Sequence, residues 1–86
     1  MTIKQNPVSD LKAWQYTNPL RKHLGTTGIK QLAAATILGV APITVRSWMD
    51  GFAQPSHKHR HTIARFMGLR PKAMDAEWDK WLGQKP

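Results

Sequence analysis

Two residues that break helices stand three positions apart in an apolar stretch: Gly39 and Pro42 in AAATILGVAPITVRSWMDG (33–51). A single helix through both would lose a backbone hydrogen bond at the proline and would be weakened further by the glycine. Proline is favoured in the first turn of a helix, however, because its missing N–H has no partner there. The stretch therefore predicts two short helices, one ending at Gly39 and one starting at Pro42, with a tight corner between them.

Helical signals continue on both sides of this corner. Asn18 before Pro19, and Ser56 before the segment 57–67, are typical helix caps. No stretch alternates between apolar and polar residues over a useful strand length. The sequence therefore predicts an all-α fold, a compact bundle of five to six short helices. The expected segments are 9–16, 19–24 with Gly25 as its stop, 29–38 with Ile29, Leu32, Ala35 and Leu38 buried, 42–50, 57–67, and one from Pro71 onward.

Basic residues are concentrated in the middle of the chain. Thirteen Lys and Arg against five Asp and Glu give a net charge of +8, and Asp50 is the only acid between residues 11 and 74. Such a body attracts polyanions, and nucleic acid is the expected partner. A role in solubility alone is the alternative explanation.

The length of 86 residues suits one domain. The chain has no cysteine, which excludes disulfides and thiolate chemistry, and no apolar run approaches the roughly 20 residues that span a bilayer. We therefore expect a cytoplasmic protein without a membrane partner. Residues 1–8 are expected to be a flexible arm, 9–70 the main domain, and 71–86 a C-terminal helix.

Two blocks with matching spacing, GIKQLAAATILGVAPITVRSWMDG (28–51) and PSHKHRHTIARFMGL (55–69), carry a family resemblance. Together they resemble the helix-turn-helix domain of the lambda-repressor-like (Cro and phage-repressor) family. Its pattern is Gly-hydrophobic-Thr-Gln-x-x-Leu-Ala-x-x-Leu-Gly-Val followed by a second helix ending in Gly. The resemblance implies a helix-turn-helix at about residues 30–50 within the 9–70 domain. Arg60 and His61 depart from the family, which usually has leucines there.

The resemblance also implies which residues meet base edges, namely Pro42, Ile43, Thr44 and Ser47, with Arg46 beside them. Aliphatic side chains can press on thymine methyl groups, and arginine can grip guanine with two hydrogen bonds for about 1–3 kcal/mol of discrimination. Two alternatives stay open. Ile43 lies near the phase of the inward-facing Val45 and can instead be a core residue, and Arg46 can be an ordinary solvated cation.

Phosphate contacts are expected on two flanks. Gln31 occupies a position that contacts phosphate in the family, next to a helix N-terminus whose amides suit an anion. Thr27 can alternatively be the N-cap of that helix. The full set of expected phosphate contacts is Thr26, Thr27, Lys30 and Gln31 on one flank and His57, Lys58, His59 and Arg60 on the other.

The run HKHRH (57–61) also carries a metal motif, because His57 and His61 are four residues apart and share a helix face. No carboxylate stands nearby in sequence and the chain has no cysteine. On these grounds the sequence predicts no metal site and no cofactor.

The C-terminal segment carries an apolar stripe at helical spacing. Its members are Met74, Trp78, Trp81 and Leu82. The stripe is expected either to complete the small core or to form a homodimer interface, where large aromatic residues are common.

These features predict a sequence-specific double-stranded DNA-binding regulator, a phage- or plasmid-type repressor that occludes a promoter. Its expected partner is an operator with two-fold symmetric half-sites, bound as a homodimer, without a small-molecule ligand. The alternative is an architectural or recombination accessory protein that bends DNA. Catalysis is not expected, because the acids are scattered and the histidines have no nucleophile or orienting acid near them in sequence.

Overall fold

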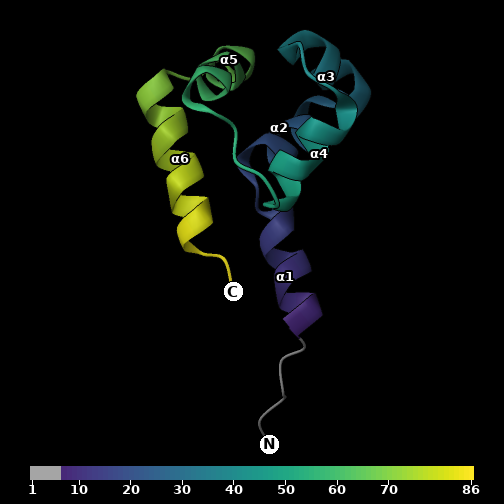
Figure 1. Ribbon diagram of the computed structural model, residues 1–86, viewed down its shortest axis with the longest axis vertical. Coiled ribbons are helices and arrows are strands. Elements are labelled where there is room, and N and C mark those ends of the chain that lie inside the picture. The colour runs from purple at the N-terminus through teal and green to yellow at the C-terminus, as the bar shows by residue number, and fades with distance from the viewer. Residues whose placement is uncertain (1–6) are drawn as a thin grey trace, which may run out of the picture.

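The computed structural model describes residues 7–86, and these residues form six α-helices and no strand. The helices are α1 (Pro7–Tyr16), α2 (Pro19–Thr27), α3 (Gln31–Leu38), α4 (Pro42–Asp50), α5 (His57–Met67) and α6 (Pro71–Gly83) (Figure 1). The predicted all-α fold is therefore confirmed for this part of the chain. Residues 1–6, most of the predicted flexible arm, lie outside the described residues.

Local side-chain signals explain where several helices start. The side chain of Asn18 accepts a hydrogen bond from the N–H of Arg21 at 3.0 Å, and Pro19 occupies the first turn of α2. Ser56 caps α5 by accepting from the N–H of His59 at 3.3 Å. Prolines lead α4 and α6, as expected. Because each signal acts within one helical turn, the sequence alone was enough to predict these starts.

Two helix ends differ from the prediction. α1 begins at Pro7, so the expected start at residue 9 is two residues late. α2 continues through Gly25 to Thr27. The hydroxyls of Thr26 and Thr27 donate to backbone carbonyls four residues earlier, at 2.9 and 2.8 Å, and the N–H of Gly28 closes the helix. Through these bonds, backbone carbonyls in the last turns of α2 have hydrogen-bond donors, and the helix continues past Gly25.

All six helices contribute to one core. The buried apolar residues are Trp14, Leu20, Leu24, Ala34, Ala35, Leu38, Val45, Trp48, Met49, Ile63, Ala64, Met74, Trp78 and Trp81. In α3 the buried face is formed by residues 34, 35 and 38, whereas Leu32 is 66% exposed, contrary to expectation. The reason is phase: the inward face of α3 follows positions 31, 34, 35 and 38, and Leu32 is one residue off this face.

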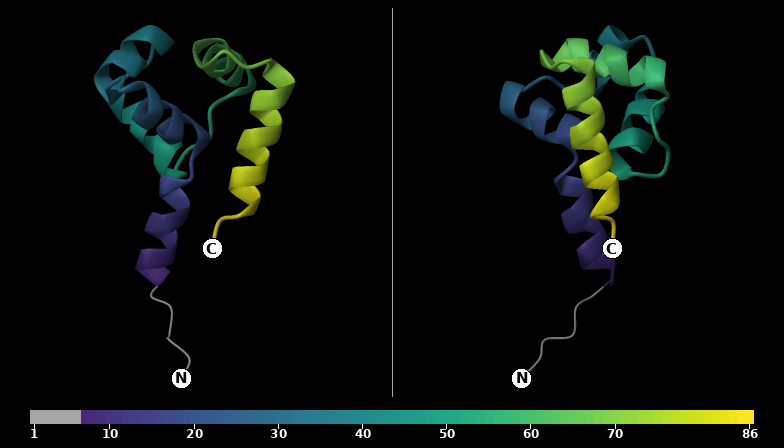
Figure 2. Two further views of the ribbon diagram at one scale, coloured as in Figure 1. Left: turned by 180° about the vertical axis from the view of Figure 1, so that it is seen from behind. Right: turned by 90° about the vertical axis from the view of Figure 1, so that its left-hand side faces the viewer.

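The two tryptophans Trp14 and Trp81 join α1 to α6. The end of α6 lies next to the end of α1 that leads into α2, and the rest of α1 continues past it (Figures 1 and 2). The indole rings stack with centroids 4.0 Å apart and planes 5° apart. Each indole N–H donates to the backbone carbonyl of the other residue, Trp14 to Trp81 at 2.6 Å and Trp81 to Trp14 at 2.8 Å. Both indole donors are thereby satisfied inside the core, as buried polar groups require.

The apolar stripe of α6 lies against the chain's own core. Met74 and Trp78 are fully buried, Trp81 is 2% exposed, and Leu82 is half-buried. Two roles were predicted for this stripe, and the three buried residues have the first of them: they complete the core. Their burial leaves no part of these three side chains available to a second copy.

No single helix within residues 7–86 is long and apolar enough to cross a membrane. Only α3 and α4 taken together reach that length and apolarity, and they are bent by 106° relative to each other.

Candidate nucleic-acid interface

The corner between α3 and α4 is closed by backbone hydrogen bonds around a left-handed glycine. Gly39 has φ +72°, a conformation that residues with a side chain rarely adopt. Its N–H donates to the carbonyl of Thr36 at 3.2 Å, and the N–H of Val40 donates to Ala35 at 3.0 Å. This pair of hydrogen bonds is the Schellman motif, which ends a helix and reverses the chain direction. After three linking residues, α4 begins at Pro42, and the two helices meet at 106°.

α4 has one buried and one outward side. Val45, Trp48 and Met49 are at most 4% exposed and hold the helix against the core. The outward side carries all five predicted base-contact residues: Pro42, Ile43 and Arg46 are exposed, and Thr44 and Ser47 are half-buried. Ile43 is 67% exposed, so the alternative that it belongs to the core is wrong.

Gln31 connects the first turns of the two helices. Its side-chain amide donates to the backbone carbonyl of Pro42 at 3.1 Å. One amide hydrogen is therefore used to hold α3 against α4, and the second amide hydrogen remains to donate to a phosphate. Lys30 precedes α3 and is exposed. We call the set Lys30, Gln31, Pro42, Ile43, Thr44, Arg46 and Ser47 the corner surface.

Arg46 is the only arginine of the corner surface, and its side chain is 67% exposed. Its Nε lies 3.6 Å from Oδ2 of Asp50, one turn further along α4. The Arg46 side chain is largely in solvent, and an i,i+4 ion pair along a helix contributes only about 0.3–0.5 kcal/mol. The guanidinium is therefore held loosely and can reach another acceptor at little cost.

The structure adds Lys12 of α1 as a cation beside α4. Lys12 lines a surface hollow of about 250 Å³ together with Arg21, Arg46 and Asp50. Asp50 accepts from Arg21 at 2.5 Å, and this bond ties α2 to α4. Sequence reasoning missed Lys12 because it stands 34 residues before Arg46 and belongs to no motif. Only the packing of α1 beside α4 brings the two cations together.

The two expected phosphate contacts in α2, Thr26 and Thr27, are exposed at the end of the helix. The hydroxyl hydrogens of Thr26 and Thr27 are used in the hydrogen bonds that end α2. Thr27 is also not the N-cap of α3, because it lies inside α2 and Lys30 takes that position without a side-chain cap bond. On this flank the residues suited to phosphate contact are Lys30 and Gln31.

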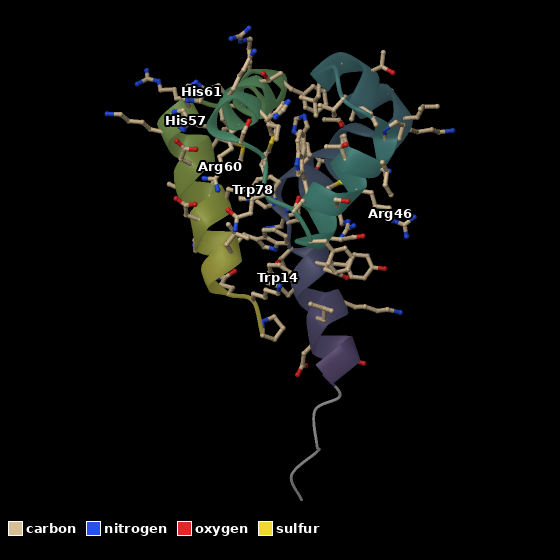
Figure 3. All side chains as sticks on the ribbon, in the orientation of Figure 1. Trp14, Arg46, His57, Arg60, His61 and Trp78 are labelled. Atoms are coloured by element: carbon tan, nitrogen blue, oxygen red, sulfur yellow. The ribbon has the colours of Figure 1, made fainter. Side chains whose placement is uncertain are left out.

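The basic residues of α5 point in two directions. Lys58 is exposed, and the ring of His59 lies 5.2 Å from Trp48 of α4. His57, Arg60 and His61 instead lie beside α6, across the molecule from Arg46 (Figure 3). The second expected flank is therefore split, since helical phase turns only Lys58 and His59 away from α6.

Arg60 corrects the prediction most clearly. Its side chain is only 13% exposed, and its Nη1 lies 3.0 Å from Asp79 and 3.5 Å from Asp75, both in α6. A guanidinium engaged by two carboxylates is not free to bind a phosphate. The same ion pairs explain how Arg60 occupies a position where the resembled family has leucine: α6 supplies acids where a leucine would need apolar neighbours.

Among the predicted site residues, the structure brings together those of the corner surface and places His57 and Arg60 beside α6, while the hydroxyls of Thr26 and Thr27 bond within α2. Comparisons of the chain with models of protein families, with curated proteins and with solved structures found no match.

Proposed function

We propose that this protein is a sequence-specific double-stranded DNA-binding regulator, which inserts α4 into the major groove and represses transcription by occluding a promoter. The observation that carries the proposal is the corner surface: an exposed, partly basic helix face at a 106° corner on a chain of net charge +8. Helix-turn-helix proteins join their two helices at about 90–120°, with the second helix in the groove.

The chemistry of α4 supports base recognition. A helix enters the major groove with its N-terminal side chains toward the base edges. In α4 that end carries the exposed Ile43, which suits thymine methyl groups, and Arg46, which suits the two acceptors of guanine. Thr44 and Ser47 add hydroxyl groups. The helix is fixed from behind by the buried Val45 and Trp48, so these side chains act from a rigid support.

The first turn of α3 supports a backbone contact beside the groove. The N-terminal amides of a helix of this kind bear partial positive charge and have no partner within the helix. Lys30 and Gln31 stand at this end, and the Gln31 bond to Pro42 sets the spacing between it and α4. Lys12 and Lys58 are further exposed cations for the flanking phosphates.

The proposal includes two copies bound to a two-fold symmetric operator. In such complexes the half-sites are about one helical turn of DNA apart. The α6 stripe is not the contact between the copies, because Met74, Trp78 and Trp81 are buried in each chain.

Selection of bound duplexes from a random-sequence pool tests the proposal with the full chain. The expected result is one enriched motif, repeated as inverted half-sites. A pool without enrichment contradicts sequence-specific binding. Strong bending of the selected duplex, measured by energy transfer between its labelled ends, supports the architectural alternative instead.

Arg46→Ala is expected to weaken binding to the selected duplex by roughly 5- to 150-fold, equivalent to about 1–3 kcal/mol for one bidentate base contact. Fluorescence anisotropy at one fixed salt concentration measures the affinity. The matched control is Arg65→Ala, which removes the same charge from an exposed site in the last turn of α5. Equal losses in the two variants would place recognition elsewhere than α4.

Ile43→Asn is expected to change which base is preferred at one position of the motif, with a smaller effect on affinity for the best duplex. Asparagine replaces a methyl contact with a group that pairs with adenine. Because Ile43 is 67% exposed, the fold should be unaffected, and its melting temperature is the control. The preferred base is measured by repeating the selection with the variant. An unchanged motif argues against a base contact by Ile43.

A further inference from the structure

Two histidines of α5 and an acid of α6 come together on the side of the molecule away from Arg46. One potential ligand atom from each of His57, His61 and Asp75 lies within 4.8 Å of the other two. The histidine rings stand side by side, with centroids 4.3 Å apart (Figure 3). The sequence places Asp75 fourteen residues after His61, in a different helix, and only the packing of α6 on α5 supplies the carboxylate.

We propose that His57, His61 and Asp75 form a binding site for a divalent transition-metal ion of the zinc type. Imidazole nitrogen and carboxylate oxygen are both zinc ligands, at about 2.0–2.2 Å from the metal. Three protein ligands leave a fourth position for water. Ligand atoms around a tetrahedral ion at these bond lengths are about 3.3 Å apart, so the three groups need to close by small side-chain rotations. His57 is exposed in the first turn of α5 and has room for this movement.

The surroundings of the three ligands favour a cation. Asp75 and Asp79 together carry two negative charges, and Arg60 between them carries one positive charge. Arg60 lies closer to Asp79, at 3.0 Å, than to Asp75, at 3.5 Å. It can therefore keep its stronger partner while Asp75 binds the ion through an oxygen, and it orients that carboxylate as outer-shell partners of metal sites do.

The proposed site links two helices, so binding should stabilise the folded chain. The unfolded chain does not hold α5 and α6 ligands together, and an ion that binds only the folded state shifts the folding equilibrium. At free zinc tenfold above its dissociation constant the shift is about elevenfold. For a domain of this size the melting temperature should then rise by roughly 5–10 °C.

The test uses the full chain without an added histidine tag, stripped of metal with a chelator. Calorimetric titration with ZnCl₂ is expected to give one site per chain, and Co²⁺ should develop the strong visible absorption of a four-coordinate ion. Magnesium at millimolar concentration should neither bind nor shift melting, because it prefers oxygen ligands in an octahedral arrangement.

Three variants locate the site. His57→Ala and Asp75→Asn are each expected to weaken zinc binding by at least roughly tenfold, the effect typical of losing even an outer-shell partner. His59→Ala is the matched control on the same helix, since the His59 ring bonds to Ser56 and faces Trp48. It should keep the zinc affinity within about twofold, a change that is negligible beside the loss of a ligand. The readout is the melting shift caused by zinc in each variant, so a lower metal-free stability does not obscure it.

Absence of zinc binding by the unaltered chain overturns the proposal. Unchanged affinity in Asp75→Asn also overturns it, because binding would then need only the histidine pair of α5. None of these measurements involves DNA, and their outcome is independent of the proposed function.

Discussion

Replacing Trp81 with alanine is expected to lower the free energy of unfolding by about 3–5 kcal/mol, the usual cost of removing a buried tryptophan side chain. Trp81 is 2% exposed, stacks on Trp14 at 4.0 Å and contacts Trp78 edge-on at 5.7 Å. Its removal opens a cavity between α1 and α6 that no neighbouring helix can fill without moving. Urea unfolding followed by circular dichroism measures the effect.

Trp81→Phe is the graded control. It retains an aromatic ring against Trp14 and loses the indole N–H that donates to the Trp14 carbonyl. That carbonyl still accepts from Thr17, so the cost should stay near 1–2 kcal/mol, mostly from lost packing. Sedimentation supplies a second readout: the folded Trp81→Phe protein should keep the mass of the unaltered chain. A loss of mass would show that Trp81 supports a dimer contact.

Gly51→Ala is the second large effect, expected at about 2–5 kcal/mol. Gly51 ends α4 with φ +78°, and a side chain there costs about 1–2 kcal/mol in the backbone alone. A methyl group would also collide with the indole ring of Trp14, and displacing a packed ring adds about 1–3 kcal/mol. The free energy of unfolding from urea denaturation measures the total.

A matched glycine separates these two contributions. Gly68 ends α5 with φ +73°, and nothing lies within 4 Å of a methyl group added there. Gly68→Ala should therefore cost only the backbone part, about 1–2 kcal/mol. In a Trp14→Phe background, Gly51→Ala should cost less than in the unaltered chain, because the shorter ring relieves the collision and leaves only the Trp81 ring close, 3.2 Å from the added methyl group. Equal costs for the two glycines in the unaltered chain would contradict the proposed collision.

The sequence predicted those features whose signals act within a few residues. Gly39 and Pro42 indicated the corner between α3 and α4, and Asn18 and Ser56 indicated helix starts. In each case one residue type satisfies or removes a backbone hydrogen bond in its own turn. The prediction of Gly25 as a stop was wrong because two threonine hydroxyls after it could satisfy the helix end instead.

Features that depend on packing between distant segments could not be predicted from the sequence. From the sequence, Arg60 looks like a surface cation. In the structure, Asp75 and Asp79 of α6 lie beside it. No carboxylate stands near His57 and His61 in sequence, and the packing of α6 on α5 brings Asp75 within reach of them. Charge pairs across helices leave no periodic pattern, because each partner alone looks like an ordinary solvated residue.

Asp50 is the ion-pair partner of Arg46. It is the only acid among residues 11–74, its side chain is 16% exposed, and it is shared by Arg21 and Arg46. If Arg46 binds a base as proposed, Asp50 would still have Arg21 at 2.5 Å, so its carboxylate would keep a partner. In the proposed complex, binding of Arg46 to a base would therefore be an exchange of one ion-pair partner for another. Arg21 of α2, outside the corner surface, would thus lower the cost of moving Arg46 from Asp50 to a base in the proposed complex.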